Sequence, residues 1–380
     1  MDVENHSPFP HMVIEKATTQ GRYFDVVIVA GSFTLAHGQP VLAMDEQMPI
    51  QCVDRYVGAP ESTPFLEETH LVVGKQRTDV HVLGHARPVD GKPATHWPIG
   101  VRVGPITKTA LVTGLRAWHW TPLRGWHLTK PEATTAVPLH AGMAYGGAVR
   151  RARYRGPATD DIHDEQAFDT YELNPVGRGY VGEADLDRAQ FYLAPQIEDV
   201  QKPLRDIRER LAPVCFGPVP RWNPQRARYA GTYDDAWRAE HFPFLPPDFD
   251  FAFYQSAQPD LIAPGWLKGD EPITLIGCDA TGRIDTQLPG IDLLALLTDE
   301  EGLTQPTPLR LDTVTIDLDA QSVQLVWRRA VPKEWGLRKV MLAAIPAGPA
   351  QRGAVQPIHI HRDRDRDRDR NRTPAEVPGG

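Results

Sequence analysis

Cysteine, excess positive charge and long hydrophobic runs are all scarce in this sequence. Its three cysteines, Cys52, Cys215 and Cys278, are far apart and odd in number, so they make neither a disulfide framework nor a zinc-ligand pattern. Apolar runs such as VVIVA and LLALL are too short to span a bilayer. The formal net charge of −8 excludes an overall basic nucleic-acid footprint. Because MDVENHSPFP also has no signal-peptide pattern, the sequence predicts a soluble cytoplasmic protein.

Familiar catalytic and nucleotide-binding motifs are also missing. The sequence contains no G-x-S-x-G elbow, no H-E-x-x-H and no Walker A loop. NPVGRGY (174–180) lacks the G-x-G-x-x-G spacing, so Gly177 and Gly179 predict a tight turn rather than a phosphate cradle. His81 and His85 lie in a strand-like stretch that separates their rings by roughly 13 Å, too far to share a metal ion. We therefore expect no catalytic residue, no cofactor and no metal site.

Proline is abundant, at 36 of 380 residues. This is about twice its average usage of roughly 5% and disfavours long helices. Strands are predicted by segments rich in β-branched or alternating apolar residues, at 24–33, 78–88, 108–114 and 272–277. Residues 311–332 predict an antiparallel hairpin whose second strand contains Trp327. The expected fold class is mainly β with a few short helices and long, ordered Pro/Gly-rich loops.

Three segments predict short helices. Residues 198–211 place Leu204, Ile207 and Leu211 at helical spacing. Residues 291–302 (IDLLALLTDEEG) indicate a short buried helix. In the third, which includes Trp237, Thr232 is expected to be the N-cap with Asp235 three residues later.

Composition divides the chain into one domain and a tail. Residues 1–345 are expected to form a single domain, β-rich at 1–150, loop-rich at 151–265 and β-rich again at 266–345. Residues 346–380, which include HRDRDRDRDRNRTPAEVPGG, predict a disordered Arg/Asp-rich tail because they offer little apolar surface to bury. A partner-binding arm is the alternative. His359 and His361 in this tail are only weak metal-ligand candidates.

The segment AGTYDDAWRAEHFPFLPPDFD (230–250) is the densest in carboxylates and aromatics. If the chain is extended there, Asp248 and Asp250 lie roughly 7 Å apart on one face. That separation fits a two-carboxylate glycosidase or a metal site. The structural alternative, which the neighbouring prolines favour, is that both carboxylates cap turns and pair with nearby arginines, namely Arg221, Arg226 and Arg228. A second aromatic run is WHWTPLRGWH (118–127). It predicts either a platform on which sugars or bases stack, or aromatic side chains that anchor a loop to the core.

Short blocks spread over roughly residues 1–332 resemble domain-of-unknown-function family 2169, and they occur in the family order. They are NHSPF, VIEKATT, EQMPI, DRYVGAPEST, GKQRTDVHVLGHARP, VPLHAGMAYGGA, NPVGRGY, LAPQIED, RWNPQRARYAGTYDDAW, LPPDFD, LKGDE and LDTVTIDLDAQSVQLVWRR.

This resemblance implies an adaptor or chaperone of bacterial type VI secretion. Such a protein binds a PAAR-tip protein or a toxic effector in the cytoplasm and helps load it onto the secretion spike, without enzymatic activity. The expected partner-binding residues are Trp222, Trp237 and Phe249. The family-motif residues, expected to be structural, are Asn174, Gly177, Arg178, Gly179, Gly231, Thr232, Tyr233, Asp234, Asp248, Asp250, Gly269 and Trp327. The alternatives are a carbohydrate-active hydrolase, or a carbohydrate-binding module, that uses residues 230–250.

Overall fold

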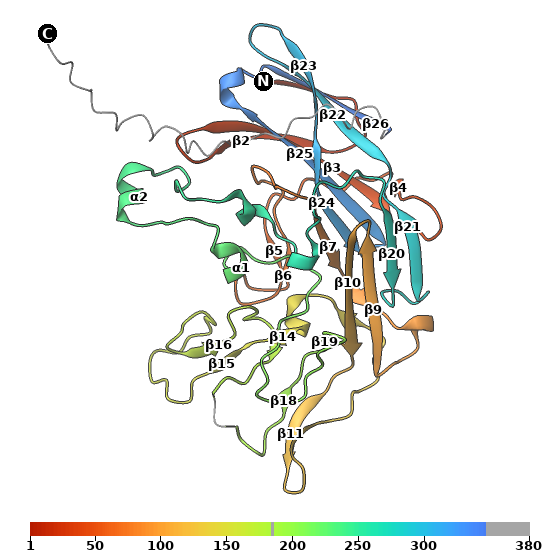
Figure 1. Cartoon of the computed structure of the whole chain (residues 1–380), viewed down its shortest axis with the longest axis vertical. Coiled ribbons are helices and arrows are strands. Elements are labelled where there is room, and N and C mark those ends of the chain that lie inside the picture. Colours follow the sequence, from red (N-terminus) through yellow and green to blue (C-terminus); the bar gives the residue numbers. More distant parts are fainter. Residues whose placement is uncertain (184–185, 347–380) are drawn as a thin grey trace, which may run out of the picture. The chain divides into compact units, whose positions relative to one another are not determined.

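Strands dominate the computed structural model, which describes residues 1–183 and 186–346 (Figure 1). Within this part the only α-helices are α1 (Pro224–Ala227) and α2 (Asp235–Glu240), each of one or two turns. The expected fold class, mainly β with a few short helices, is therefore confirmed. No helix in the described residues is long and apolar enough to cross a membrane. The predicted tail from residue 347 onward lies outside the described residues, and the domain boundaries stay predictions.

The central sheet has the strand order β2-β3-β25-β24-β7, with β4 added to part of β3. The predicted hairpin is confirmed, because β24 and β25 pair antiparallel with Val314 opposite Leu325. β7 joins the sheet in parallel, which places Val80 beside Val314. The bounds are β2 (His11–Ala17), β3 (Tyr23–Thr34), β4 (Leu42–Ala43), β7 (Asp79–Leu83), β24 (Arg310–Asp317) and β25 (Ser322–Pro332).

Two further sheets pack against the central one. One has the order β1-β26-β22-β23 and the other β19-β10-β9-β20-β21. Their strands are β1 (Asp2–Asn5), β26 (Lys339–Pro346), β22 (Ile291–Thr298), β23 (Thr304–Pro308), β19 (Ile197–Glu198), β10 (Ile106–Thr113), β9 (His96–Val103), β20 (Pro272–Ile276) and β21 (Arg283–Gln287).

The prediction of a helix at 291–302 was wrong, because this segment supplies strand β22. Along β22 the side chains of Leu293, Ala295 and Leu297 are buried and their neighbours less so. This period of two is that of a strand with one face on a core. A short run of apolar residues does not distinguish the two structures by periodicity alone.

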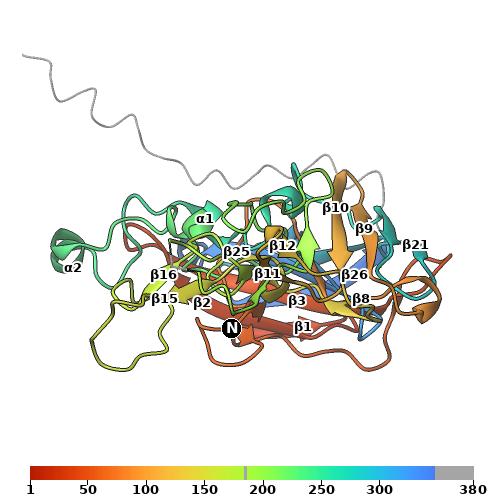
Figure 2. The same cartoon turned by 90° about the horizontal axis from the view of Figure 1, so that it is seen from below.

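The main apolar core lies between the central sheet and the two sheets packed on it. Val27 and Val29 of β3 point into this core, whereas Val26 and Ile28 point to the opposite face. On that opposite face they meet Ile50 and other apolar residues from the loops, including Val73, Leu71, Phe251 and Tyr254. β3 is thus buried on both faces, because loops from the first part of the chain (around residues 50 and 71–73) and from the loop-rich middle (around 251–254) form a third layer over the sheet (Figure 2).

A smaller core is built from β11 (Ala117–Thr121), β12 (Gly125–Leu128), β18 (Tyr192–Leu193) and the loops beside them. Leu204 and Ile207 are buried in it, but the helix predicted at 198–211 does not form. Instead, Asp199 and Asp206 accept hydrogen bonds from the backbone two residues further on, at 2.7 and 2.8 Å. Such side-chain bonds to the local backbone compete with helix formation.

Short elements complete the described part. They are β5 (Arg55–Tyr56), β6 (Phe65–Glu67), β8 (His85–Ala86), β13 (Val137–Pro138), β14 (Tyr145–Gly146), β15 (Ala148–Arg150), β16 (Phe168–Thr170), β17 (Arg178–Gly179), and the 3-10 turns η1 (Val89–Gly91), η2 (Ala141–Met143), η3 (Phe251–Tyr254), η4 (Pro259–Leu261) and η5 (Lys333–Trp335).

Candidate functional site

Residues 230–247 form an arm around helix α2, and we call this segment the aromatic arm. The predicted helix is confirmed, but its N-cap is Asp234 rather than Thr232. The carboxylate of Asp234 accepts the backbone N–H of Trp237 at 2.7 Å. Carboxylates at this position satisfy a free N–H group and interact favourably with the helix dipole. In Figures 1 and 2, α2 lies at the outer end of a loop that extends away from the strands.

Asp248 closes the base of the arm. Its two carboxylate oxygens accept hydrogen bonds from the backbone N–H and the hydroxyl of Thr232, at 2.9 and 2.8 Å. These bonds lower the pKa of the Asp248 carboxyl. Gly231 makes the closure possible, because its φ is +80° and a Cβ there would lie 2.8 Å from the Asp248 carboxylate. Asp248 therefore has a structural role, but its hydrogen bonds join it to Thr232, 16 positions away, and do not cap a turn as predicted.

Asp250 and Phe249 fasten the end of the segment to the protein body. Asp250 caps η3 by accepting the backbone N–H of Ala252 at 2.9 Å. Phe249 is only 8% exposed and its ring packs 5.4 Å from that of Phe251. The expectation that Phe249 is an exposed partner-binding residue was therefore wrong. A phenylalanine between two carboxylates that are themselves held by local hydrogen bonds fits a local core equally well.

The arginines proposed to pair with these carboxylates have other partners. Arg226 is buried and its guanidinium lies 2.7 Å from Glu68, while Arg221 lies 3.1 Å from the same carboxylate. Arg228 donates to the Tyr229 hydroxyl at 2.9 Å. The predicted ion pairs with Asp248 and Asp250 were wrong, because hydrogen-bond donors nearer in the chain already satisfy those carboxylates.

Exposed aromatic side chains gather on the arm around the half-buried Trp237. The rings of Tyr233 and Phe242 lie 4.7 and 5.9 Å from the Trp237 ring, edge to face. Tyr233 is 51% exposed and Phe242 is 67% exposed. The Trp237 indole N–H donates to the Phe244 carbonyl at 2.9 Å, and the Phe244 ring contacts Tyr23 at the start of β3. Internal contacts therefore fix these aromatics while leaving two of them open to solvent.

Trp222, the other expected partner-binding residue, lies outside the arm. It is half-buried and its ring packs edge to face on His163, at 4.7 Å. Its indole nitrogen is buried and has no hydrogen-bond partner among the described residues. Of the three expected residues, only Trp237 lies in the aromatic arm, and there it is half-buried.

The NPVGRGY block links neighbouring loops. The Asn174 side chain donates to the carbonyls of Ala141 and Tyr145, at 2.8 and 3.0 Å. Arg178 donates to the Gly142 carbonyl at 2.8 Å. The predicted turn lies at Asn174–Gly177, where the Gly177 N–H donates to the Asn174 carbonyl at 3.2 Å, but Gly177 does not have the expected positive φ. Gly179 has a φ of +100° within strand β17, and a Cβ on Gly177 would come within 2.7 Å of the backbone. Two further motif residues also have structural roles. Trp327 is 2% exposed and packs in the core, and Gly269 adopts a φ of +86°.

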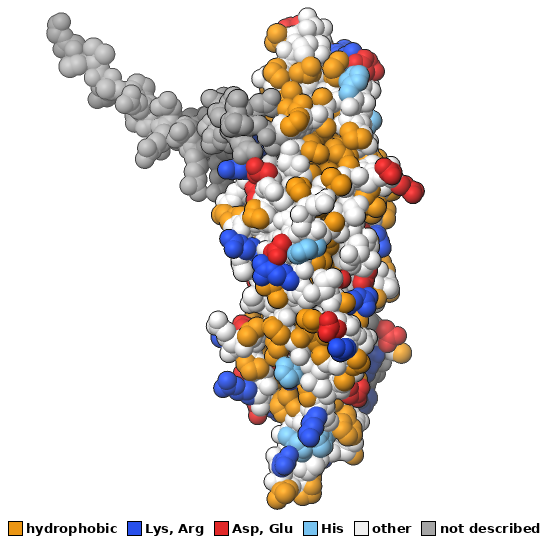
Figure 3. All heavy atoms as spheres, turned by 90° about the vertical axis from the view of Figure 1, so that its right-hand side faces the viewer, with side chains coloured by type: hydrophobic (Ala, Val, Ile, Leu, Met, Phe, Trp, Pro, Cys, Tyr) orange, Lys and Arg blue, Asp and Glu red, His pale blue; other side chains and the backbone are white. Residues whose placement is uncertain are grey.

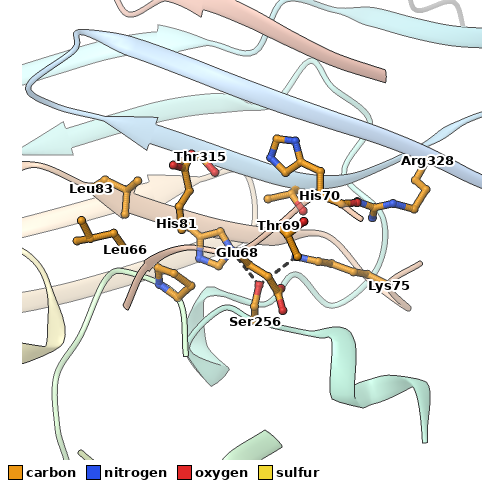
Figure 4. A pocket seen from close by; sticks show the side chains of 13 residues that line it. Leu66, Glu68, Thr69, His70, Lys75, His81, Leu83, Ser256, Thr315 and Arg328 are labelled. Carbon is orange, nitrogen blue, oxygen red and sulfur yellow. Dashed lines mark hydrogen bonds between the residues drawn. The ribbon is translucent and has the colours of Figure 1, made fainter. Parts of the chain in front are cut away.

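A network of buried polar side chains lies between β7 and the middle loops (Figure 4). Lys75 lies 2.7 Å from the Asp79 carboxylate and donates to the Ser256 hydroxyl at 3.1 Å. His81 lies 3.3 Å from the same hydroxyl through Nε2. Asp79 also accepts the Ser256 backbone N–H at 2.7 Å and the Gln255 side-chain amide at 2.6 Å. An amine and an imidazole beside a hydroxyl are groups that can activate a nucleophile.

The space beside this network is too small for a substrate. The cavity measures about 20 Å³, room for about one water molecule, and Ser256 has no exposed surface. Burial lowers the pKa of His81 to about 4 and that of His70 to about 3. Burial opposes ionisation of Glu68, but the charge of Arg226 and other cations outweighs it and keeps the pKa of Glu68 at about 2. The network is therefore a structural one.

Sequence reasoning missed this network. Its local signal was weak, because Asp79 and His81 alternate with Val80 and Val82 as in a strand with one solvent-facing side. In the structure that side is covered by the loop that carries Ser256. Only the fold brings together residues so far apart in the sequence.

Comparison with known proteins identifies the family but no activity. The model of the family described as "Uncharacterized protein conserved in bacteria (DUF2169)" matches residues 20–328. The chain therefore belongs to this bacterial family. No curated protein and no solved structure matches the chain.

Proposed function

We propose that this protein is a non-enzymatic adaptor of type VI secretion that binds a PAAR-tip protein or its toxic effector in the bacterial cytoplasm. The resemblance of the sequence blocks motivates the proposal. The structural observation that supports it best is the aromatic arm, where Tyr233 and Phe242 are exposed around Trp237. Exposed aromatics fixed in position have little conformational entropy to lose on binding, and such residues are enriched among the energetic centres of protein interfaces.

The use made of the carboxylates also favours binding over hydrolysis. Both oxygens of Asp248 accept hydrogen bonds from Thr232, and Asp250 caps η3. A general acid or nucleophile needs an oxygen that faces the substrate, within hydrogen-bond reach of the reacting group. We propose that these two residues shape the arm and perform no chemistry.

Co-expression with the PAAR protein or effector encoded beside this protein tests the proposal. A complex that survives affinity purification and size-exclusion chromatography is the expected result. If none of the PAAR proteins and effectors encoded beside this protein co-purifies with it, the proposal is contradicted.

A hydrolase screen on polysaccharides, with and without divalent metals, tests the enzymatic alternative. We expect no turnover by the parent. If the parent hydrolyses a polysaccharide, and the D248N/D250N variant loses this activity while keeping the circular dichroism spectrum of the parent, the protein is a hydrolase and the adaptor proposal is contradicted.

A further inference from the structure

The hairpin of β11 and β12 places its side chains on two faces. Trp118 and Trp126 lie on the face that packs into the smaller core. Successive side chains of a strand alternate between faces. His119 and His127 therefore lie together on the other face, each half-buried. In Figure 1 this hairpin is at the bottom, and in Figure 3 the same end shows histidine and basic side chains among hydrophobic ones.

The two histidines are directly opposite each other in the antiparallel register. Their ring centroids are 3.9 Å apart and their planes are inclined by 57°. Nδ1 of His127 lies 3.0 Å from the Gly125 carbonyl oxygen. A carbonyl only accepts, so Nδ1 carries the proton and Nε2 keeps its lone pair. The ring of His119 is stacked on Phe191, at 5.6 Å and 16°. Both rings are thus oriented by their neighbours.

We propose that His119 and His127 form a binding site for a divalent transition-metal ion of the Zn²⁺, Ni²⁺ or Cu²⁺ class. Neutral imidazole is a preferred ligand of these ions. A metal-binding histidine almost always donates its other ring N–H to a carboxylate, a backbone carbonyl or water, as His127 does here. The site is separate from the aromatic arm and does not rest on the adaptor proposal.

The rings must move apart to share an ion. With metal–nitrogen distances of about 2.1 Å, two bound imidazoles have centroids roughly 5.3 Å apart in tetrahedral Zn²⁺ geometry, and roughly 4.6 Å apart at the right angle of a square-planar or octahedral Cu²⁺ or Ni²⁺ ion. The observed 3.9 Å is closer to the right-angle value, so the pair fits Ni²⁺ or Cu²⁺ better than Zn²⁺. Within the described residues no group of three or more possible protein ligands occurs. The remaining coordination positions of the ion therefore belong to water or to a donor atom from a bound molecule.

Titration of untagged protein with ZnCl₂ and NiCl₂ by isothermal calorimetry tests this site. The parent and all variants carry H359A and H361A, so that the tail histidines outside the described residues do not contribute. One equivalent of metal is expected to bind this H359A/H361A parent. H119A and H127A should each weaken binding by more than about tenfold, because each removes a ligand. H96A, which replaces an exposed histidine on β9, should bind like the parent.

Two results would overturn the proposal. One is a parent that binds no metal, and the other is binding that survives in both H119A and H127A. Paramagnetic Ni²⁺ provides a second measurement on the unmutated hairpin. It should broaden the NMR signals of the Trp120 and Trp126 indoles before that of Trp327 in the central sheet, and broadening in the reverse order would also reject the site.

Discussion

The ammonium group of Lys75 lies 2.7 Å from the carboxylate of Asp79, and both side chains are almost completely excluded from solvent. Asp79 accepts further bonds from Gln255 and Ser256, so the pair ties the start of β7 to the loop that covers it. A buried ion pair is costly to break, because the remaining charge has no partner and no water. This pair is therefore one of the contacts that attach the loop layer to the central sheet, beside the apolar cluster around Val26 and Ile28.

Replacing Asp79 with alanine should lower the free energy of unfolding by about 3–5 kcal/mol. Urea denaturation followed by circular dichroism measures this loss. The matched control is K92A, which breaks the exposed Lys92–Asp90 pair and should cause no measurable change. Equal stability of D79A and the parent would mean that the pair does not fasten the loop layer.

Stability should fall as the pH drops from about 6.5 towards 4. His81 and His70 have pKa values of about 4 and 3 in the folded protein, both below the usual 6.5 because of burial. The unfolded chain therefore binds protons first, and acidification favours unfolding. At pH 5 each histidine should reduce the free energy of unfolding by roughly 2 kcal/mol. Urea midpoints between pH 7 and 5 that do not change, or that rise on acidification, would contradict this account.

Gly231 and Gly302 form a matched pair for testing the closure of the arm. Both have positive φ, +80° and +83°, but a Cβ on Gly231 meets Asp248, Pro246 and Phe249 whereas one on Gly302 meets nothing. G302A should therefore show only the backbone penalty, roughly 1 kcal/mol. G231A should show that penalty plus the steric clash, and it should increase proteolysis within residues 230–247. Equal effects of the two substitutions on the melting temperature and on proteolysis would mean that the arm is not closed by Asp248.

Local patterns predicted the parts of the fold in which one face of an element is buried. The hairpin containing Trp327 was clear because its apolar residues alternate and a turn separates its strands. The segment 291–298 was not, because LLALL has apolar residues at both helical and strand spacing. At 198–211 the Asx turns at Asp199 and Asp206 compete with a helix that the apolar spacing alone favours.

The candidate site was also predictable only where local sequence patterns specify the structure. The dense aromatic and acidic composition of 230–250 pointed to the arm, and its helix was predicted from a capping pattern that placed the N-cap at Thr232, two residues before its actual position at Asp234. Which aromatics are exposed did not follow, since Phe249 lies between two aspartates and is nevertheless only 8% exposed, whereas Phe242 is 67% exposed. The bis-histidine pair required the register of β11 and β12, which the sequence run WHWTPLRGWH does not specify by itself.

The most direct test of the adaptor account is the affinity of the arm for its partner. Calorimetry would compare the parent, the Y233A/F242A variant and the W335A variant with the purified PAAR protein or effector encoded beside this protein. Trp335 is 43% exposed and outside the arm, so it is a control for the loss of an exposed aromatic. The account predicts that Y233A/F242A weakens binding by at least about tenfold and that W335A leaves it unchanged. Binding of Y233A/F242A with the parent's affinity would contradict the account.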